Sequence, residues 1–260
     1  MTQQPLQTDI KDHVATLRMN RPDVHNAFDD ALIAALTVEM VRLEQLPAVR
    51  VIVLAANGKS FSAGADLNWM RRMAKYSRTD NLRDAEALAG LMRTLAGISK
   101  PTIARVQGAA FGGGVGLVAC CDIAIASSDA TFSLSEVRLG LIPSVISPYV
   151  IAAIGEREAR RYFLTAERFD AVEARRIGLV HEVTDAAALD ATIARIVGHL
   201  LKGGPQALGA AKKLIADVSR RPMDEKLAKE TASRIASIRV EREGQEGLAA
   251  FLDKRAPDWI

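Results

Sequence analysis

Apolar residues follow two different periods in the first two thirds of the chain. Short apolar runs of the kind found in buried strands occur at residues 14–19, 51–54, 102–106, 122–126 and 131–132. Between them, residues 29–46 and 80–96 place leucine and methionine at three- and four-residue spacing, which predicts amphipathic helices. The alternation of the two patterns predicts an α/β fold whose parallel strands are joined by crossover helices.

The pattern changes after about residue 185, where the strand-like runs end. Four helix-like segments follow, at residues 186–201, 206–218, 225–240 and 244–254. We therefore divide the chain into an α/β core, residues 1–195, and a helical C-terminal region, residues 196–260. An amphipathic helix does not reveal what it covers, so the apolar residues of this region pack either on the chain's own core or against another subunit.

Composition limits the classes of protein to consider. A chain of 260 residues with 49% apolar and 25% charged residues can bury a large core without disulfides or metal. Its two cysteines, Cys120 and Cys121, are adjacent, and the four histidines lack metal-ligand spacing, so we expect a reduced protein without a metal site. The first ten residues lack the apolar core of a signal peptide, and no apolar run is long enough to span a bilayer. We expect a cytoplasmic location and no membrane partner.

The charges are nearly balanced, with 34 basic and 31 acidic residues and a net charge of +3. Only 5% of residues are aromatic, and no basic stripe is interleaved with aromatic side chains. Nucleic-acid-binding proteins concentrate both features, so we expect no nucleic-acid partner.

The first segment that suggests chemistry is Phe-Ser-Ala-Gly-Ala-Asp, residues 61–66, which follows the strand at 51–54. Small residues between a strand and a helix let a ligand approach the backbone. Asp66 suits the cap of a helix that begins near Leu67. A tight strand–helix turn without any ligand is the simpler interpretation of this segment alone.

The second segment is the glycine-rich stretch 108–116, which lies between a predicted strand and a helix that reaches Cys120. Glycines at a helix start expose unpaired N–H groups at the positive end of the helix dipole, a site for a phosphate or an oxyanion. The dinucleotide pattern G-x-G-x-x-G fails at Leu117, and the P-loop lysine would fall on Gly114. An oxyanion hole is thus the better functional interpretation, and close helix–sheet packing is the structural one.

The third segment, residues 131–143, contains Glu136 in an otherwise apolar stretch before a turn at Gly140 and Pro143. Apolar surroundings raise the pKa of a carboxyl group, which suits proton transfer near neutral pH. The alternative is a surface glutamate paired with Arg138.

Together with Asn-Arg-Pro at 20–22 and Asn26-Ala27, these segments, in this order, resemble the crotonase (enoyl-CoA hydratase/isomerase) superfamily over residues 14–255. The resemblance implies a spiral of ββα repeats, with a C-terminal helical trimerisation region that forms homotrimers or homohexamers. It also implies an acyl-CoA thioester substrate and no separate cofactor, since CoA is part of the substrate.

The resemblance also implies roles for single residues. By motif position, the N–H groups of Ala63 and Gly113 bind the thioester oxygen, and Glu136 is the acid/base carboxylate. The residues expected to line the acyl-CoA site are Asp23, Val24, His25, Ala27, Ala65, Asp66, Leu67, Gly112 and Ser144.

Gly116 departs from the family pattern, because typical hydratases of the family carry a second glutamate there. One carboxylate can still move a proton between carbons, as in the family's enoyl-CoA isomerases. However, residues 61–70 and 135–150 resemble bacterial methylglutaconyl-CoA and carboxygeranoyl-CoA hydratases, several of which have a small residue at this position.

We therefore expect a carbon–oxygen lyase, an enoyl-CoA hydratase whose acyl group is branched or carboxylated. An isomerase is the alternative, and a non-catalytic acyl-CoA-binding or scaffold protein is an alternative of another class. Arg138, Ser144 and Ser147 are candidates to bind an acyl carboxylate, and Ser144 could instead hold the water.

Overall fold

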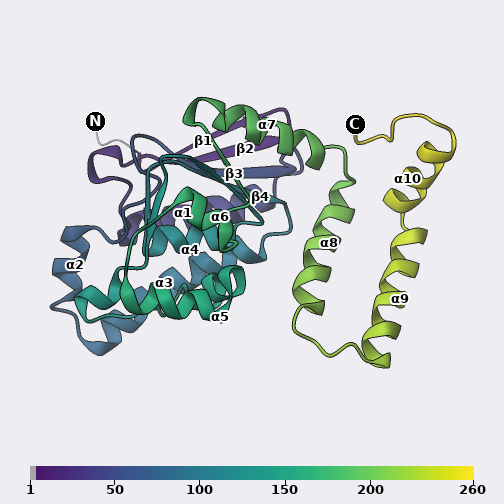
Figure 1. Cartoon of the computed structure of the whole chain (residues 1–260). Coiled ribbons are helices and arrows are strands. Elements are labelled where there is room, and N and C mark those ends of the chain that lie inside the picture. The colour runs from purple at the N-terminus through teal and green to yellow at the C-terminus, as the bar shows by residue number, and fades with distance from the viewer. Residues whose placement is uncertain (1–3) are drawn as a thin grey trace.

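The computed structural model describes residues 4–260 and contains a six-stranded sheet in the order β1-β2-β3-β4-β6-β9 (Figure 1). Its strands are β1 (Leu6–Lys11), β2 (Val14–Met19), β3 (Val51–Ala56), β4 (Thr102–Val106), β6 (Ile123–Ser127) and β9 (Glu182–Thr184). The β1–β2 pair is antiparallel, and each later pair is parallel. The expected α/β fold with crossover helices is confirmed.

Strand β3 shows why the sequences of the central strands are continuous apolar runs. Its side chains alternate between two clusters: Ile52 and Leu54 face the main core, whereas Val51 and Val53 face the opposite side of the sheet. The main core lies under helices α1 (Asp30–Glu44), α3 (Arg78–Gly97) and α4 (Gly113–Cys120). On the other side, α7 (Leu189–Leu200) covers the sheet, so that both faces exclude water (Figure 1).

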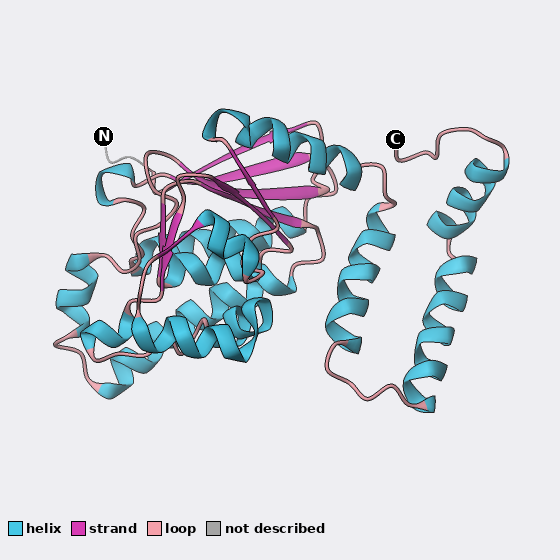
Figure 2. Cartoon of the chain, in the orientation of Figure 1, coloured by secondary structure: helices cyan, strands magenta, loops and turns pink. Residues whose placement is uncertain are grey.

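A second, three-stranded sheet has the order β5-β7-β8 (Figure 2). Its strands are β5 (Ala109–Phe111), β7 (Thr131–Ser133) and β8 (Phe169–Asp170), and the helices near it are α5 (Ser147–Thr165) and α6 (Ala171–Arg176). The units β4-β5-α4 and β6-β7-α5 each place one strand in each sheet before their helix. This is the ββα spiral that the sequence resemblance implied.

The last three helices stand to one side of this core (Figure 1). They are α8 (Pro205–Val218), α9 (Glu225–Val240) and α10 (Arg242–Leu252). The Arg50 guanidinium ties the chain at their start to the core, because it donates to the carbonyls of Leu201 at 3.0 Å and Gly203 at 2.6 Å. The expected division between residues 195 and 196 falls inside α7, whereas the separate helices begin at Pro205.

The remaining differences from the predicted elements have simple causes. Strand β1 was not predicted, because it is an edge strand whose residues are nearly all exposed and lack apolar alternation. The segment 186–201 begins as a 3-10 turn, Ala186–Ala188, before α7. Helix α9 has the predicted bounds. No helix within residues 4–260 is long and apolar enough to cross a membrane.

Candidate active site

The three candidate segments meet at Gly112. Its backbone has a φ of +50°, which favours glycine. A Cβ atom at this position would lie 3.2 Å from Oε1 of Glu136 and 4.0 Å from Cα of Gly64. The absence of a side chain therefore lets the Glu136 carboxyl group and the segment 61–66 approach the glycine-rich loop from two sides.

Backbone pairing positions the segment 61–66 against its neighbours. Ser62 pairs with the strand β5, since its N–H donates to the Ala109 carbonyl at 2.9 Å and its own carbonyl accepts from Phe111 at 2.8 Å. Two residues on, Phe28 bridges the same segment by donating to Gly64 O at 2.7 Å and accepting from Asp66 N at 2.7 Å. The loop is thus fixed by hydrogen bonds on both sides.

Two backbone N–H groups beside Gly112 remain open. Because Gly64 and Asp66 make the bridge to Phe28, the N–H of the exposed residue Ala65 points away from it, and it has no acceptor within residues 4–260. Gly113 is the first residue of α4, and its N–H also lacks an acceptor in the described chain, as expected for a first helical turn. The predicted donor Gly113 is thus available, with a second open donor at Ala65.

The assignment of Ala63 as the second donor needs correction. Its N–H donates to the His25 carbonyl at 3.0 Å and is therefore occupied. Gly64, at φ +95°, turns the backbone between Ala63 and Ala65. The N–H of Ala63 therefore faces the loop at His25, whereas the N–H of Ala65 does not. Motif position selected the alanine whose N–H is occupied, and only the backbone hydrogen bonds distinguish the two alanines.

Glu136 is the first residue of a 3-10 turn, Glu136–Leu139, which follows strand β7. Its Oε2 atom is buried and has no hydrogen-bond partner in the part of the chain that is described. Burial raises the pKa of this carboxyl group above its ordinary value. Arg138 is exposed and forms no ion pair with Glu136 in residues 4–260, so the surface-pair interpretation is wrong.

Asp66, expected to contact CoA, is occupied by the protein itself. Only 6% of it is exposed, and its Oδ1 accepts from the N–H groups of Asn68 at 2.8 Å and Trp69 at 3.2 Å, which confirms the predicted helix cap. Its Oδ2 is bound by Arg21 at 3.0 Å, and Arg21 also pairs with Asp29 at 2.8 Å. The Asp66 carboxylate therefore stabilises the start of the helix Leu67–Met73 and binds Arg21.

The other expected contact residues differ in exposure. Ala27 is buried. The exposed ones are Asp23, Val24, His25, Leu67 and Ser144. Ser147 donates to the Ser144 carbonyl at 2.8 Å, so these two residues close the turn that precedes α5.

Sequence reasoning assigned no role to Asn26, although it lies in the Asn-Arg-Pro…Asn-Ala motif. Its side chain is fully buried and donates to the carbonyls of Asn57 and Ser60, each at 2.8 Å. Its Oδ1 accepts from the Arg21 N–H at 2.8 Å. Asn26 and Arg21 thus fix the loop that supports the segment 61–66. The place of Asn26 in the Asn-Arg-Pro…Asn-Ala motif was the sequence signal that could have indicated this role.

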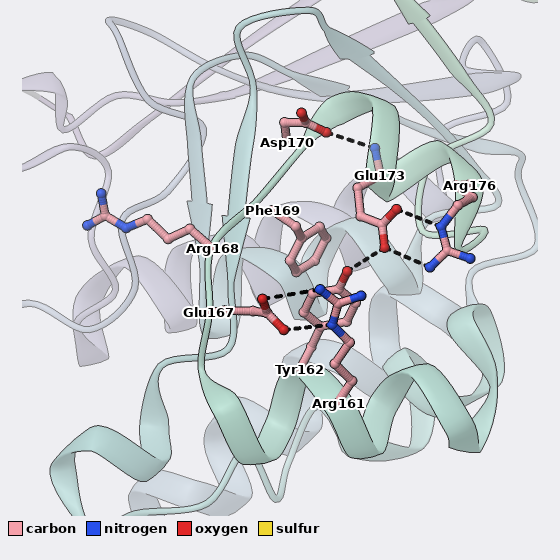
Figure 3. Close-up of a pocket in the computed structure, with 8 residues that line it drawn as sticks. All are labelled: Arg161, Tyr162, Glu167, Arg168, Phe169, Asp170, Glu173 and Arg176. Atoms are coloured by element: carbon pink, nitrogen blue, oxygen red, sulfur yellow. Dashed lines mark hydrogen bonds and ion pairs between the residues drawn. The ribbon is translucent and has the colours of Figure 1, made fainter.

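The cavity drawn in Figure 3 does not include Glu136. It has a volume of about 380 Å³, and four of its charged groups form ion pairs: Arg161 pairs with Glu167, and Arg176 pairs with Glu173. We therefore place the chemistry at the loops around Gly112. Within residues 4–260, no cluster of three His, Cys, Asp or Glu residues could hold a metal ion.

Comparison with known proteins identifies the family. The enoyl-CoA hydratase/isomerase family model matches residues 9–260. A solved enoyl-CoA hydratase from Shewanella pealeana is 48% identical, with a TM-score of 0.96 over 98% of this chain and 96% of that chain. A crotonyl-CoA hydratase from Syntrophomonas wolfei and a 2,3-dehydroadipyl-CoA hydratase from Escherichia coli are each 31% identical. The alignments cover 96% and 95% of this chain, and 95% and 94% of those relatives. This chain therefore belongs to the enoyl-CoA hydratase/isomerase family, the crotonase superfamily that its motifs resemble.

Proposed function

We propose that the protein adds water to a 2-enoyl-CoA thioester. The observation that carries this proposal is the Glu136 carboxyl group against Gly112, whose buried Oε2 has no hydrogen-bond partner in the described chain, beside two open backbone N–H groups. In the proposed complex, the thioester carbonyl oxygen accepts from Ala65 and Gly113. Attack at the β-carbon moves negative charge onto this oxygen, and each preorganised donor of this kind contributes roughly 10²- to 10³-fold in rate.

Glu136 supplies the proton transfers in this proposal. As a carboxylate, it removes a proton from the attacking water while the water oxygen bonds to the β-carbon. The protonated carboxyl group then delivers a proton to the α-carbon, which collapses the enolate and restores the carboxylate. A group with a raised pKa suits both steps, and such general acid/base catalysis contributes roughly 10²- to 10⁴-fold.

We propose that the acyl group is branched or carboxylated, such as 3-methylglutaconyl. The name of the E. coli relative, 2,3-dehydroadipyl-CoA hydratase, supports an acyl carboxylate. Arg138 lies two residues from Glu136, is exposed, and forms no ion pair within residues 4–260. A carboxylate at the far end of the acyl group would give this guanidinium a partner, with Ser144 on the following turn as a second donor.

Double-bond isomerisation is the second candidate, and Gly116 favours it. This position carries no carboxylate, so Glu136 alone would shuttle one proton between the α- and γ-carbons of a 3-enoyl-CoA. Neither reaction needs a cofactor beyond the CoA of the substrate.

One experiment separates these functions. Purified protein is incubated separately with crotonyl-, 3-methylglutaconyl- and 3-enoyl-CoA in H₂¹⁸O, and the product masses are measured by mass spectrometry. Hydration places ¹⁸O in the product, whereas isomerisation leaves the mass unchanged. Absence of turnover with all three substrates would contradict the proposal and favour a non-catalytic acyl-CoA-binding protein.

We also propose that the C-terminal helices assemble homotrimers or homohexamers. Within α8 to α10, only Leu227 and Ala250 are buried, whereas apolar residues such as Val240, Phe251 and Leu252 are 75–82% exposed. Large apolar patches on an isolated chain indicate a surface that another chain covers. Light scattering should give three or six times the monomer mass, and a monomer at micromolar concentration would contradict the proposal.

A further inference from the structure

The surroundings of Gly116 leave no space for a side chain. A Cβ atom there would lie 2.3 Å from Cγ2 and 2.9 Å from Cβ of Ile146, and 3.2 Å from Cε of Met92. Real Cβ atoms essentially never approach atoms of other residues within 3.0 Å, so any substitution forces the neighbours to move. The methionine end can bend, but the contact with Ile146 lies at the branched base of its side chain.

Ile146 cannot easily withdraw from this contact. It lies at the start of α5, where its carbonyl accepts from the N–H groups of Tyr149 at 3.1 Å and Val150 at 3.0 Å. Only 3% of Ile146 is exposed, so its side chain is enclosed on the other sides as well. A β-branched residue with a fixed backbone has few rotamers to adopt.

This contact lies close to the catalytic carboxyl group. Gly116 donates to the Gly112 carbonyl at 3.2 Å, so the two glycines are one turn apart on nearly the same face of α4. The Glu136 carboxyl group lies against Gly112. The Gly116–Ile146 contact therefore lies roughly one helical turn, about 5–6 Å, along α4 from the point where Glu136 approaches the helix.

We propose that Ile146 excludes a second carboxylate from this site. Its side chain fills the space that an acidic side chain at position 116 would need, and it presents an apolar surface there. Glu136 consequently performs both proton transfers without a second carboxylate to share the water. This inference rests on the proposed function. It assigns the presence of a single carboxylate in the site to the contact between Gly116 and Ile146.

The inference makes the two positions energetically dependent on each other. Gly116→Glu alone should overpack the core and lower the melting temperature by roughly 5 °C or more. Ile146→Ala alone leaves a cavity and should also lower it. In the double variant the new side chain enters that cavity, so its melting temperature should lie well above the value expected from adding the two single effects.

Two control variants separate packing from charge and from helix propensity. Gly116→Gln has the size of glutamate without its charge, and it should show the same dependence on Ile146. Gly90→Glu also introduces glutamate at a helical glycine, but a Cβ there meets nothing within 4 Å. It should leave the melting temperature unchanged or slightly higher.

Activity provides the second measurement, on the intact protein with the acyl-CoA that the wild type turns over. Gly116→Glu alone should lose activity at least roughly 10-fold. The double variant should recover part of this loss and gain a second ionisation in its pH–rate profile, as expected of two nearby carboxylates. A pH profile with one acidic ionisation in every variant would contradict the inference.

The outcomes are distinguishable. Strictly additive melting temperatures, or a Gly116→Glu variant as stable as Gly90→Glu, would overturn the role of Ile146 while leaving the hydratase proposal intact. A wild type that turns over none of the enoyl-CoA substrates would overturn the proposed function, and with it this role, whatever the melting temperatures show.

Discussion

Two carboxylates lie in neighbouring loops of the same site, and their environments are opposite. Asp66 accepts two backbone hydrogen bonds and one from Arg21, whereas Oε2 of Glu136 has no hydrogen-bond partner among residues 4–260. Burial acts to raise both pKa values. At Asp66 the hydrogen bonds and the Arg21 charge outweigh burial and lower the pKa, whereas at Glu136 burial prevails.

Burial alone therefore does not set the direction of a carboxylate pKa shift in this protein. A satisfied carboxylate stabilises the fold through its partners, whereas a partnerless one costs stability and stays available for proton exchange. Substitution should therefore separate the two residues: changes at Glu136 should affect the reaction, and changes at Asp66 should affect the fold. The predictions below test this separation.

The largest effect is expected from Glu136→Gln. The amide keeps the size of the side chain but cannot exchange a proton, so turnover of the accepted enoyl-CoA should fall by at least roughly 100-fold. The melting temperature at pH 7 should stay equal or rise, because the substitution removes a poorly solvated charge. A variant that keeps most of its turnover would move the proton transfer to another group, with the turn at Ser144 and Ser147 as the first suspect.

The same contrast extends to the backbone, where Gly113 has an open N–H. Gly113→Pro removes this donor at the first helical position, which tolerates proline, and turnover should fall roughly 10²- to 10³-fold. Gly113→Ala is the matched control, since its Cβ meets the same Phe28 ring at 3.1 Å but the N–H remains. Equal losses in the two variants would attribute the effect to Phe28 and contradict the oxyanion hole.

Asp66→Ala should have the opposite effect from Glu136→Gln, because it should lower the stability of the fold. It removes a helix cap and one partner of Arg21, so we expect a loss of about 1–2 kcal/mol in the free energy of unfolding. Asp224→Ala is the control, because Asp224 caps α9 through Leu227 N–H at 2.8 Å and has no arginine partner in the described chain. Denaturant titrations that give equal losses would show that the Arg21 pair contributes nothing.

Much of the fold could be predicted from the sequence, because the central strands are buried on both faces and the helices are amphipathic. Strand β4 and helix α9 have the predicted bounds. Strand β1 lacked any signal, since its stability comes from pairing with β2 and not from apolar alternation. Helix α5 was also missed: Gly155, with a φ of +76°, interrupts it, and Pro148 lies in its first turn.

The environment of Glu136 was predictable, because it depends on the side chain and its neighbours along the sequence. Glu136 stood out as an acidic residue in an apolar stretch, and its pKa shift has the expected direction. The open backbone N–H groups were only half predictable. Whether the N–H of Ala63 or of Ala65 is free depends on the hydrogen bond from Ala63 to His25, which lies 38 residues away along the chain. Similarly, the contact between Gly116 and Ile146 joins positions 30 residues apart and depends on how α4 packs against α5.

The smallest predicted effect is also the most direct test of the comparison, because the two carboxylates should respond to pH in opposite ways. The folded-state pKa of Glu136 is raised above its ordinary value of 4.5, so the wild type loses stability as pH rises through 4.5 and up to the folded-state pKa. The folded-state pKa of Asp66 lies below 3.8, so its contribution is present above pH 3.8 and is lost as pH falls through the folded-state value.

Melting temperatures of the wild type, Glu136→Gln and Asp66→Asn, measured from pH 3 to pH 8, should therefore diverge. Relative to the wild type, Glu136→Gln should gain a few degrees or less as pH rises above 4.5, since the glutamine never becomes charged. Asp66→Asn, which keeps a capping side chain but loses the charge beside Arg21, should be less stable at neutral pH and approach the wild type near pH 3. If the melting-temperature differences of the two variants from the wild type change with pH in the same direction, the two carboxylates have the same kind of environment. That result would contradict the contrast between Asp66 and Glu136.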